Sequence, residues 1–256
     1  RTIRHMRFDI VTLFPELFTP FLSIGITRRA FESKQVDVRL WNPRDYADGT
    51  YRRIDDRPFG GGPGMVMMAE PLKRCLKAIQ NDRDAAPVVL FSPIGEPITQ
   101  QLVTNWSTST GAILICGRYE GIDQRFIDTY VDAQISLGDF VLSGGEIAAL
   151  ALLDAVARLQ PGVLSDEDSH HQDSFNTALD GLLDCPHYTR PEIWDNQTVP
   201  EVLLSGHHVN IEAWRREQGL AMTFLKRPEL IEQARKANNL SKADENFIAK
   251  LSKSAT

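Results

Sequence analysis

The chain has 256 residues, enough for one large domain or for a core domain with a small second one. Its 42% hydrophobic and 24% charged residues are typical of a soluble globular protein. The net charge of −6 argues against a general nucleic-acid coat protein, which is normally basic. A membrane helix is not expected, because no run approaches the roughly 18–20 apolar residues that it needs.

The N-terminus and the cysteines indicate a reducing compartment. Residues 1–6 are basic, but Asp9 follows instead of a long apolar segment, so we predict no secretory signal. The sequence is compatible with a native start at Met6, and Arg1–His5 receives no structural weight. The three cysteines, Cys75, Cys116 and Cys185, are far apart and form no Cys-x-x-Cys pair. Neither a disulfide framework nor a zinc site is indicated, and we predict a cytoplasmic protein without a dedicated metal site.

The first half of the chain alternates strand and helix patterns. Val36–Leu40 alternates apolar and polar residues, which is typical of an edge strand. Val88–Phe91 and Ala112–Cys116 are continuous apolar runs, as expected for buried strands of a parallel sheet. The remaining predicted elements are a strand over Phe8–Leu13 and helices over Pro71–Ile79 and Thr99–Trp106. This order predicts an α/β fold with a mostly parallel sheet.

The second half is predicted to be mainly helical. Ser143 can cap an apolar helix over Ile147–Leu159, and Glu146 completes a capping box. Residues 165–174 are polar and acidic, which indicates a mobile linker or lid. Beyond them we predict a small helical domain. Its helices are expected over 209–217, 220–225 and 228–237, and from Ser241, with Asp244 as the acid at the third position, toward Leu251.

Glycine and small polar residues follow three of the predicted strands, in Ser92–Gly95, Gly117–Gly121 and Leu137–Gly145. In open α/β sheets, ligands bind beyond the carboxyl ends of the strands. Glycines there let a ligand approach the backbone closely. The pattern is compatible with a nucleotide-like ligand and also with three tight turns.

Residues 55–65 contain four glycines and two prolines. The segment is not a P-loop, because the Gly-Lys-Ser/Thr ending is absent. Two interpretations stay open, a flexible surface turn and a loop that closes on a planar ligand.

Other polar candidates have an ordinary structural explanation when taken singly. Asp173 is interpreted as a solvated carboxylate and Arg158 as a charge placed favourably at a helix C-terminus. Four basic groups could contact phosphates but are better explained as solvated charges: Arg28-Arg29, Arg52-Arg53 with Arg57, Arg215-Arg216 and Lys226-Arg227. His170-His171 and His207-His208 lack a third metal ligand at a matching spacing, and Trp194 and Trp214 are interpreted as core or interface aromatics.

Eight segments carry long and specific motifs. They are Leu13–Glu16, Trp41–Asp45, Asp55–Met65, Cys116–Asp123, Gly138–Glu146, Asp154–Arg158, Gly181–Pro191 and Ser205–His208. Together, and in this order, they closely resemble the bacterial tRNA (guanine-N1)-methyltransferases that modify position 37, the TrmD family of the SPOUT superfamily. The resemblance runs from about Met6 to the last predicted helix.

The resemblance implies a fold and a reaction that periodicity does not predict. The fold would be an α/β domain with a deep trefoil knot, over residues 1–164, then a flexible linker, 165–175, and a small helical tRNA-binding domain, 176–256. Family members are homodimers with both active sites at the subunit interface. They transfer a methyl group from S-adenosylmethionine to N1 of guanine 37 in tRNA. They use Mg²⁺, for which this sequence has no obvious dedicated cage.

The resemblance also assigns site residues. The methyl donor would lie in a cup formed by three loops, with Ser92 and Pro93 in the first, Gly117, Tyr119 and Glu120 in the second, and Leu137, Leu142, Gly144 and Gly145 in the third. Residues 55–65 would border the donor and the target base. Guanine N1 carries a proton at neutral pH, which Asp173 of the opposite subunit would remove as general base. Arg158 would stabilise the negative charge that grows on O6.

One departure and two rival functions stay open. Asn176–Asp180 lengthens the connection after Phe175 relative to the family, so Asp166 and Asp168 are fallback candidates for the base. The first rival is a non-catalytic RNA-binding module that keeps the fold. The second is a knotted methyltransferase that acts on another base or on a ribose hydroxyl.

Overall fold

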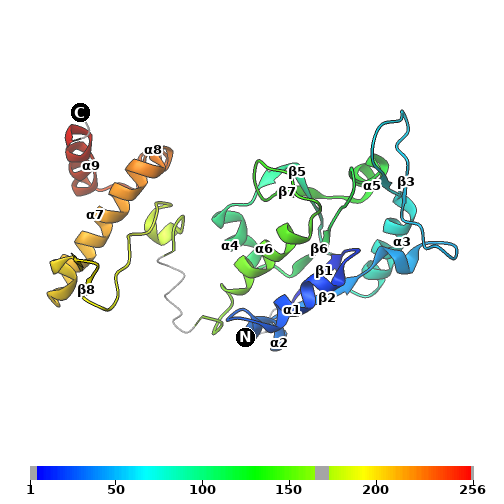
Figure 1. The fold of residues 1–256 in the computed structure, drawn as a ribbon, viewed down its shortest axis with the longest axis horizontal. Helices are drawn as coiled ribbons and strands as arrows, with labels where there is room; N and C mark the ends of the chain where they lie inside the picture. The colour runs from blue at the N-terminus through cyan, green and yellow to red at the C-terminus, as the bar shows by residue number, and fades with distance from the viewer. Residues whose placement is uncertain (1–4, 165–172, 255–256) are drawn as a thin grey trace. The chain divides into compact units, whose positions relative to one another are not determined.

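The computed structural model describes residues 5–164 and 173–254, and the chain divides into two compact units, Arg1–Glu167 (unit 1) and Asp168–Thr256 (unit 2) (Figure 1). Of the flexible linker expected over 165–175, residues 165–172 lie outside the described residues. None of the helices in the described ranges is both long and apolar enough to cross a membrane.

Unit 1 is built on a five-stranded sheet with the order β2-β1-β6-β5-β7, and every pairing in it is parallel. The predicted parallel α/β sheet is therefore confirmed, with the alternating segment at its edge as expected. Its strands are β1 (Met6–Val11), β2 (Val36–Trp41), β5 (Val88–Pro97), β6 (Gly111–Ile115) and β7 (Ala133–Ser136). All residues of β1 and β6 are buried, because helices cover both faces of the sheet.

The two faces of the sheet carry separate hydrophobic cores. On one face Phe8 and Ile10 of β1 pack with residues from four helices, α1 (Phe18–Ser23), α2 (Arg28–Glu32), α4 (Gln100–Ser107) and α6 (Glu146–Ala157). On the other face Ile113 and Ile115 of β6 pack with α3 (Ala69–Asn81) and α5 (Gln124–Tyr130). A short hairpin, β3 (Asp55–Asp56) and β4 (Val66–Met67), precedes α3. The trefoil knot implied by the resemblance stays a prediction.

The capping box predicted at Ser143 is wrong. The N-cap of α6 is Gly145, and no side chain caps the helix. Instead, Arg118 Nη1 donates to Ser143 Oγ at 3.0 Å and Arg118 Nε donates to Glu146 Oε1 at 3.2 Å. The two side chains that could have capped the helix locally are therefore both engaged by a distant guanidinium.

The described residues of unit 2 form three α-helices, α7 (His208–Lys226), α8 (Pro228–Lys236) and α9 (Lys242–Ser254), and a hairpin, β8 (Ile193–Trp194) and β9 (Gln197–Thr198). The helices expected over 209–217 and 220–225 form one helix, because Gly219 continues it and packs against the Leu183 carbonyl. The capping box predicted before α9 is confirmed: Asp244 N donates to Ser241 Oγ at 3.1 Å and Ser241 N to Asp244 Oδ2 at 2.9 Å. Trp194 is exposed and is not a core residue of this unit.

Candidate active site

Unit 1 contains a cavity of about 400 Å³ beside the carboxyl ends of β6 and β7 and the middle of β5. All nine residues predicted to hold the methyl donor line it: Ser92, Pro93, Gly117, Tyr119, Glu120, Leu137, Leu142, Gly144 and Gly145. Three segments that are separate in the sequence thus enclose one space. The sequence pattern allowed three unrelated turns, and the tertiary structure brings the segments together.

The first wall of the cavity is a bulge, and the strand end predicted at Phe91 is wrong. β5 continues to Pro97 and pairs with β7 on both sides of the bulge, so that Phe91 and Glu96 both lie opposite Ile135. Ser92 and Pro93 lie within the bulged segment. Gly95 is required there, because a Cβ atom would lie 2.5 Å from the Ile135 backbone nitrogen. The bulge presents the first cavity wall without ending the strand.

The second and third walls are joined to each other. Arg118 and Gly144 form an isolated antiparallel bridge, and Gly145 N donates to Gly117 O at 3.1 Å. A Cβ atom on Gly145 would lie 3.0 Å from the Cys116 Cα atom. The loop after β6 and the loop before α6 therefore pack backbone against backbone, and a side chain at Gly145 would push them apart.

A buried ion pair holds these two walls, and the sequence analysis did not find it. Glu146 is fully buried, and its Oε1 accepts from Arg118 Nε and from Thr12 Oγ1, both at 3.2 Å. Its Oε2 is buried and accepts no hydrogen bond from the described residues. The Arg118 guanidinium also lies over the ring of Phe14, 4.5 Å from its centroid. The signal in the sequence is Arg118 itself, a charge inside a glycine-bearing loop, whereas the local spacing assigns Glu146 to a cap.

The glycine-rich segment 55–65 reaches the cavity wall at its C-terminal end. Met65 O accepts from Glu120 N at 3.0 Å, and a Cβ atom on Gly64 would lie 2.4 Å from Glu120 Cγ. Gly60, Gly61, Gly62 and Gly64 all have positive φ, and Phe59 near them is fully exposed. The segment is therefore a turn whose end packs on a residue that lines the cavity.

The two predicted catalytic residues belong to different units. Arg158 is the C-cap of α6 and lies just beyond the end of the helix that is remote from the cavity. The 12 residues of α6 make a helix about 18 Å long, which is more than an arginine side chain spans. Asp173 lies in unit 2, where its carbonyl accepts from Asn176 N at 3.2 Å. The fallback residues Asp166 and Asp168, and His170-His171, lie outside the described residues.

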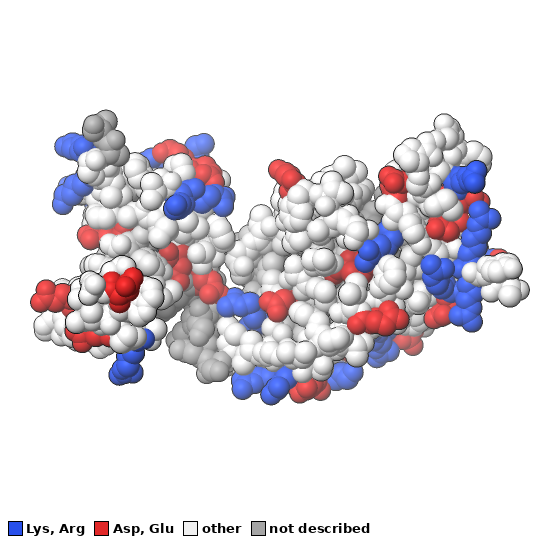
Figure 2. Space-filling model, viewed as in Figure 1, with Lys and Arg blue, Asp and Glu red and all other residues white. Residues whose placement is uncertain are grey.

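Surface charge does not identify an RNA-binding face by itself. Figure 2 shows Lys and Arg side chains gathered at the end of unit 1 beside β3 and α3. Arginines from this part of the chain pair with aspartates: Arg52 with Asp45, Arg53 with Asp56 and Arg74 with Asp48. In unit 2, Arg215 pairs with Glu212, and Arg216 pairs with Asp180 and Asp244. These groups are therefore largely neutralised within the chain.

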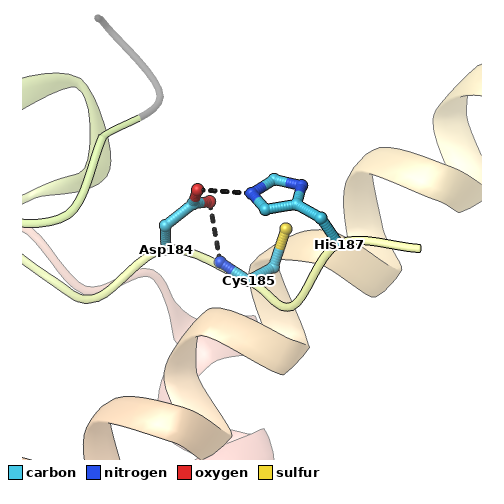
Figure 3. A group of neighbouring side chains, drawn as sticks. All are labelled: Asp184, Cys185 and His187. Carbon is cyan, nitrogen blue, oxygen red and sulfur yellow. Dashed lines mark hydrogen bonds and ion pairs between the residues drawn. The ribbon is translucent and has the colours of Figure 1, made fainter. Parts of the chain in front are cut away.

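Among the described residues, one group brings three potential metal ligands together: Asp184, Cys185 and His187 in unit 2 (Figure 3). Both carboxylate oxygens of Asp184 are already used, Oδ1 by Cys185 N at 2.7 Å and Oδ2 by His187 Nε2 at 2.8 Å. Burial, and then the nearby Asp184 carboxylate, raises the pKa of the Cys185 thiol. Because the Asp184 oxygens are already engaged within the group, it is better described as a hydrogen-bonded turn.

The fold defines an α/β protein with a cavity of small-ligand size beside the carboxyl ends of parallel strands, where open α/β sheets bind their ligands. The family model described as tRNA (Guanine-1)-methyltransferase TrmD matches residues 6–233. The chain belongs to this family.

Curated relatives match almost the whole chain. The tRNA (guanine-N(1)-)-methyltransferase of Albidiferax ferrireducens is 74% identical over 245 residues, covering 95% of this chain and 99% of its own. The protein of the same name from Paracidovorax citrulli is 67% identical, with 96% and 98% covered. That from Bordetella pertussis is 58% identical, with the same coverage of 96% and 98%.

Proposed function

We propose that this protein transfers a methyl group from S-adenosylmethionine to N1 of guanine 37 in tRNA, forming 1-methylguanine on the 3′ side of the anticodon. The observation that carries the proposal is the cavity formed by three glycine-bearing segments, in a chain that belongs to the tRNA (guanine-1)-methyltransferase family. Relatives named for that reaction match both units, which supports the same substrate here.

The cavity suits the donor in size and in chemistry. Its volume of about 400 Å³ falls in the usual range for small-ligand sites, about 300–1,000 Å³. Gly117 and Gly144 line the cavity without a side chain, so a ligand can approach the backbone closely there. Leu137 and Leu142 add apolar surface. When bound, S-adenosylmethionine supplies a methyl group attached to a positively charged sulfur.

The residues of this chain then prepare the base. N1 of guanine is a poor nucleophile while it carries its proton, and the Asp173 carboxylate accepts that proton as general base. Loss of the proton places negative charge on O6, and the Arg158 guanidinium stabilises it, as donors do in an oxyanion hole. Exclusion of water by the apolar cavity wall strengthens this electrostatic interaction.

The active chain is a homodimer, and its sites lie at the subunit interface. Arg158 is separated from the cavity of its own chain by the length of α6, so it serves the cavity of the partner. In an antiparallel, two-fold pair of α6 helices, the C-terminal end of one lies beside the N-terminal end of the other. Ile147 on α6 is 55% exposed, Val141 is 83% exposed, and Phe14 is 42% exposed, which supports an apolar contact on this side of the cavity.

Domain roles and surroundings follow from the same proposal. Residues 1–164 bind the donor, 165–175 form a flexible linker, and 176–256 help to hold tRNA. The reaction takes place in the cytoplasm, where tRNA is the substrate.

For Mg²⁺ the group of Asp184, Cys185 and His187 does not fit, because magnesium prefers oxygen ligands and the group offers one carboxylate. No step is therefore assigned to the metal.

The test is transfer of labelled methyl from S-adenosylmethionine to a tRNA transcript with guanines at positions 36 and 37. We expect label at N1 of the second guanine, and a loss of about 10²–10⁴-fold in single-turnover rate in Asp173→Ala. Asp84→Ala, which removes an exposed carboxylate from unit 1, is the control and should keep the rate. Label at a ribose 2′ position would establish the second rival function. Donor binding without any transfer would establish the RNA-binding module.

The dimer is tested by complementation in heterodimers isolated with two tags. Gly117→Leu should fill the cavity, because a Cβ atom at this glycine meets only Ile122, at 3.6 Å. Paired with a subunit that carries both Arg158→Ala and Asp173→Ala, it should recover one working site. A mixture of the two single variants, Arg158→Ala and Asp173→Ala, should recover none. No recovery in the first pairing would refute the assignment of both residues to the cavity of the partner.

A further inference from the structure

The turn Asp184-Cys185-Pro186-His187 has no role in the proposed reaction, yet its side chains are tightly organised (Figure 3). As described above, one Asp184 oxygen accepts from the Cys185 amide and the other contacts the His187 ring. Asp184 is partly buried and His187 is exposed. One carboxylate thus contacts the Cys185 backbone and the His187 side chain.

This turn contacts the segment that carries Asp173. The backbone nitrogen of Asp184 donates to Ser174 Oγ at 2.9 Å, and Phe175 N donates to Leu182 O at 2.8 Å. The two bonds close a loop between the residues that follow Asp173 and the start of the turn. The Asp184 carboxylate holds the turn, and the turn orients the backbone N–H of Asp184 toward Ser174 Oγ.

The backbone next to Asp173 is also in an unusual conformation. Phe175 has a φ of +66°, which is strained for a bulky side chain. Its ring lies 5.7 Å from the guanidinium carbon of Arg227, and Asn176 N donates to Asp173 O. Such strain persists only where surrounding contacts determine the conformation, and it clusters at functional sites.

We propose that Asp184 and Ser174 are positioning residues that set the direction of the Asp173 carboxylate on unit 2. The proposal rests on the proposed role of Asp173 as general base. Asp184 does not touch substrate. It fixes the turn, the turn holds Ser174, and Ser174 with Phe175 fixes the backbone from which the Asp173 side chain projects. A general base must lie within hydrogen-bond reach of its proton, so small displacements reduce the rate strongly.

The experiment measures single-turnover methyl transfer to the same tRNA transcript, together with dissociation constants for S-adenosylmethionine and for tRNA. Asp184→Ala should lower the rate constant about 10–100-fold, the scale of a 1 Å misplacement, and leave both dissociation constants within about twofold. Asp184→Asn should restore the rate to within about threefold, because an amide oxygen still accepts from Cys185 N and the amide nitrogen can donate to the His187 ring. Glu192→Ala, which removes an exposed carboxylate of unit 2, should have no effect.

Ser174→Ala removes only the hydroxyl that accepts from the Asp184 amide. This variant tests the proposal if Asp184→Ala does not fold. A loss comparable to that expected for Asp184→Ala supports the proposal, and a full rate overturns it. A full rate in Asp184→Ala, or a loss that follows weaker tRNA or donor binding, also overturns it. Stoichiometric zinc in the purified protein, lost in Asp184→Ala, would show a metal site instead. Asp173→Ala separates the two proposals: if it keeps the native rate, the assignment of the base itself fails.

Discussion

Substitution of Gly144 by alanine tests how the cavity is held together. A Cβ atom at this position would lie 2.4 Å from Arg118 Nε, 2.6 Å from Arg118 Cδ and 2.8 Å from Glu146 Oε2. Ordinary contacts begin at about 3.5 Å, so the Arg118 side chain must move by about 1 Å. The Nε–Oε1 hydrogen bond, already 3.2 Å long, is then lost, and the fully buried Glu146 carboxylate keeps only Thr12 as a partner.

A hydrogen bond to a charged group contributes about 1.5–3 kcal/mol, and this is the expected loss in the free energy of unfolding. For a protein of this size it corresponds to a decrease in Tm of about 3–12 °C. Because Arg118 also bonds Ser143 in the third wall, we expect the dissociation constant for S-adenosylmethionine to rise at least about tenfold. Circular dichroism melts and titration calorimetry measure the two effects.

Gly117→Ala is the matched control for stability, because its Cβ atom would meet only the Ile122 side chain, at 3.6 Å. Its Tm should stay within about 2 °C of the native value, the shift expected for less than about 1 kcal/mol. If Gly144→Ala melts like the native protein and binds the donor with native affinity, the ion pair between Arg118 and Glu146 does not depend on this glycine, and the reasoning fails.

Three further predictions concern stability and thiol chemistry. Gly95→Ala should destabilise unit 1 more than Gly144→Ala does in urea melts. The reason is that the new Cβ atom would lie 2.5 Å from the backbone of Ile135 and not beside a movable side chain. If the two variants are equally stable, the bulge of β5 is in doubt. Burial raises the pKa of the Cys75 thiol to about 12, so this cysteine should resist iodoacetamide at pH 8 until the protein unfolds, and rapid labelling seen by mass spectrometry would contradict its burial. Burial alone would raise the pKa of the Asp244 carboxyl, but the Arg216 guanidinium outweighs burial, and the pKa in the folded protein is lowered. The ion pair therefore stabilises the fold fully above the unfolded pKa of about 3.9. This stabilisation is lost as the pH falls through the lower folded pKa. Asp244→Asn should therefore lower the free energy of unfolding at pH 7, and its difference from the native protein should begin to shrink as pH falls below about 3.9. The measurement is urea unfolding as a function of pH, and a difference that already shrinks between pH 7 and pH 5 would exclude this origin.

The two predicted capping boxes show how far local sequence determines local structure. Ser241 and Asp244 form the box that their spacing predicts. Asp244 also accepts a hydrogen bond from the distant Arg216, but this bond does not displace the local ones. Ser143 and Glu146 have the same kind of spacing but form no box, because Arg118 takes both. A local rule holds where the local hydrogen bonds form beside a distant one, as at Asp244, and it fails where a distant guanidinium takes both side chains, as at Ser143 and Glu146.

The amino-acid sequence by itself determined the α/β class, the edge position of β2, the mainly helical second unit and, through its long motifs, the family and nine of the residues that line the cavity. Only the tertiary structure decided that β5 bulges where a strand end was predicted, and that a buried ion pair joins two cavity walls. It also decided that Arg158 lies a helix length from its own cavity. Periodicity and motifs reflect interactions between residues that are close in the sequence. Pairing between residues far apart in the chain depends on which strands lie side by side, and no local pattern encodes that.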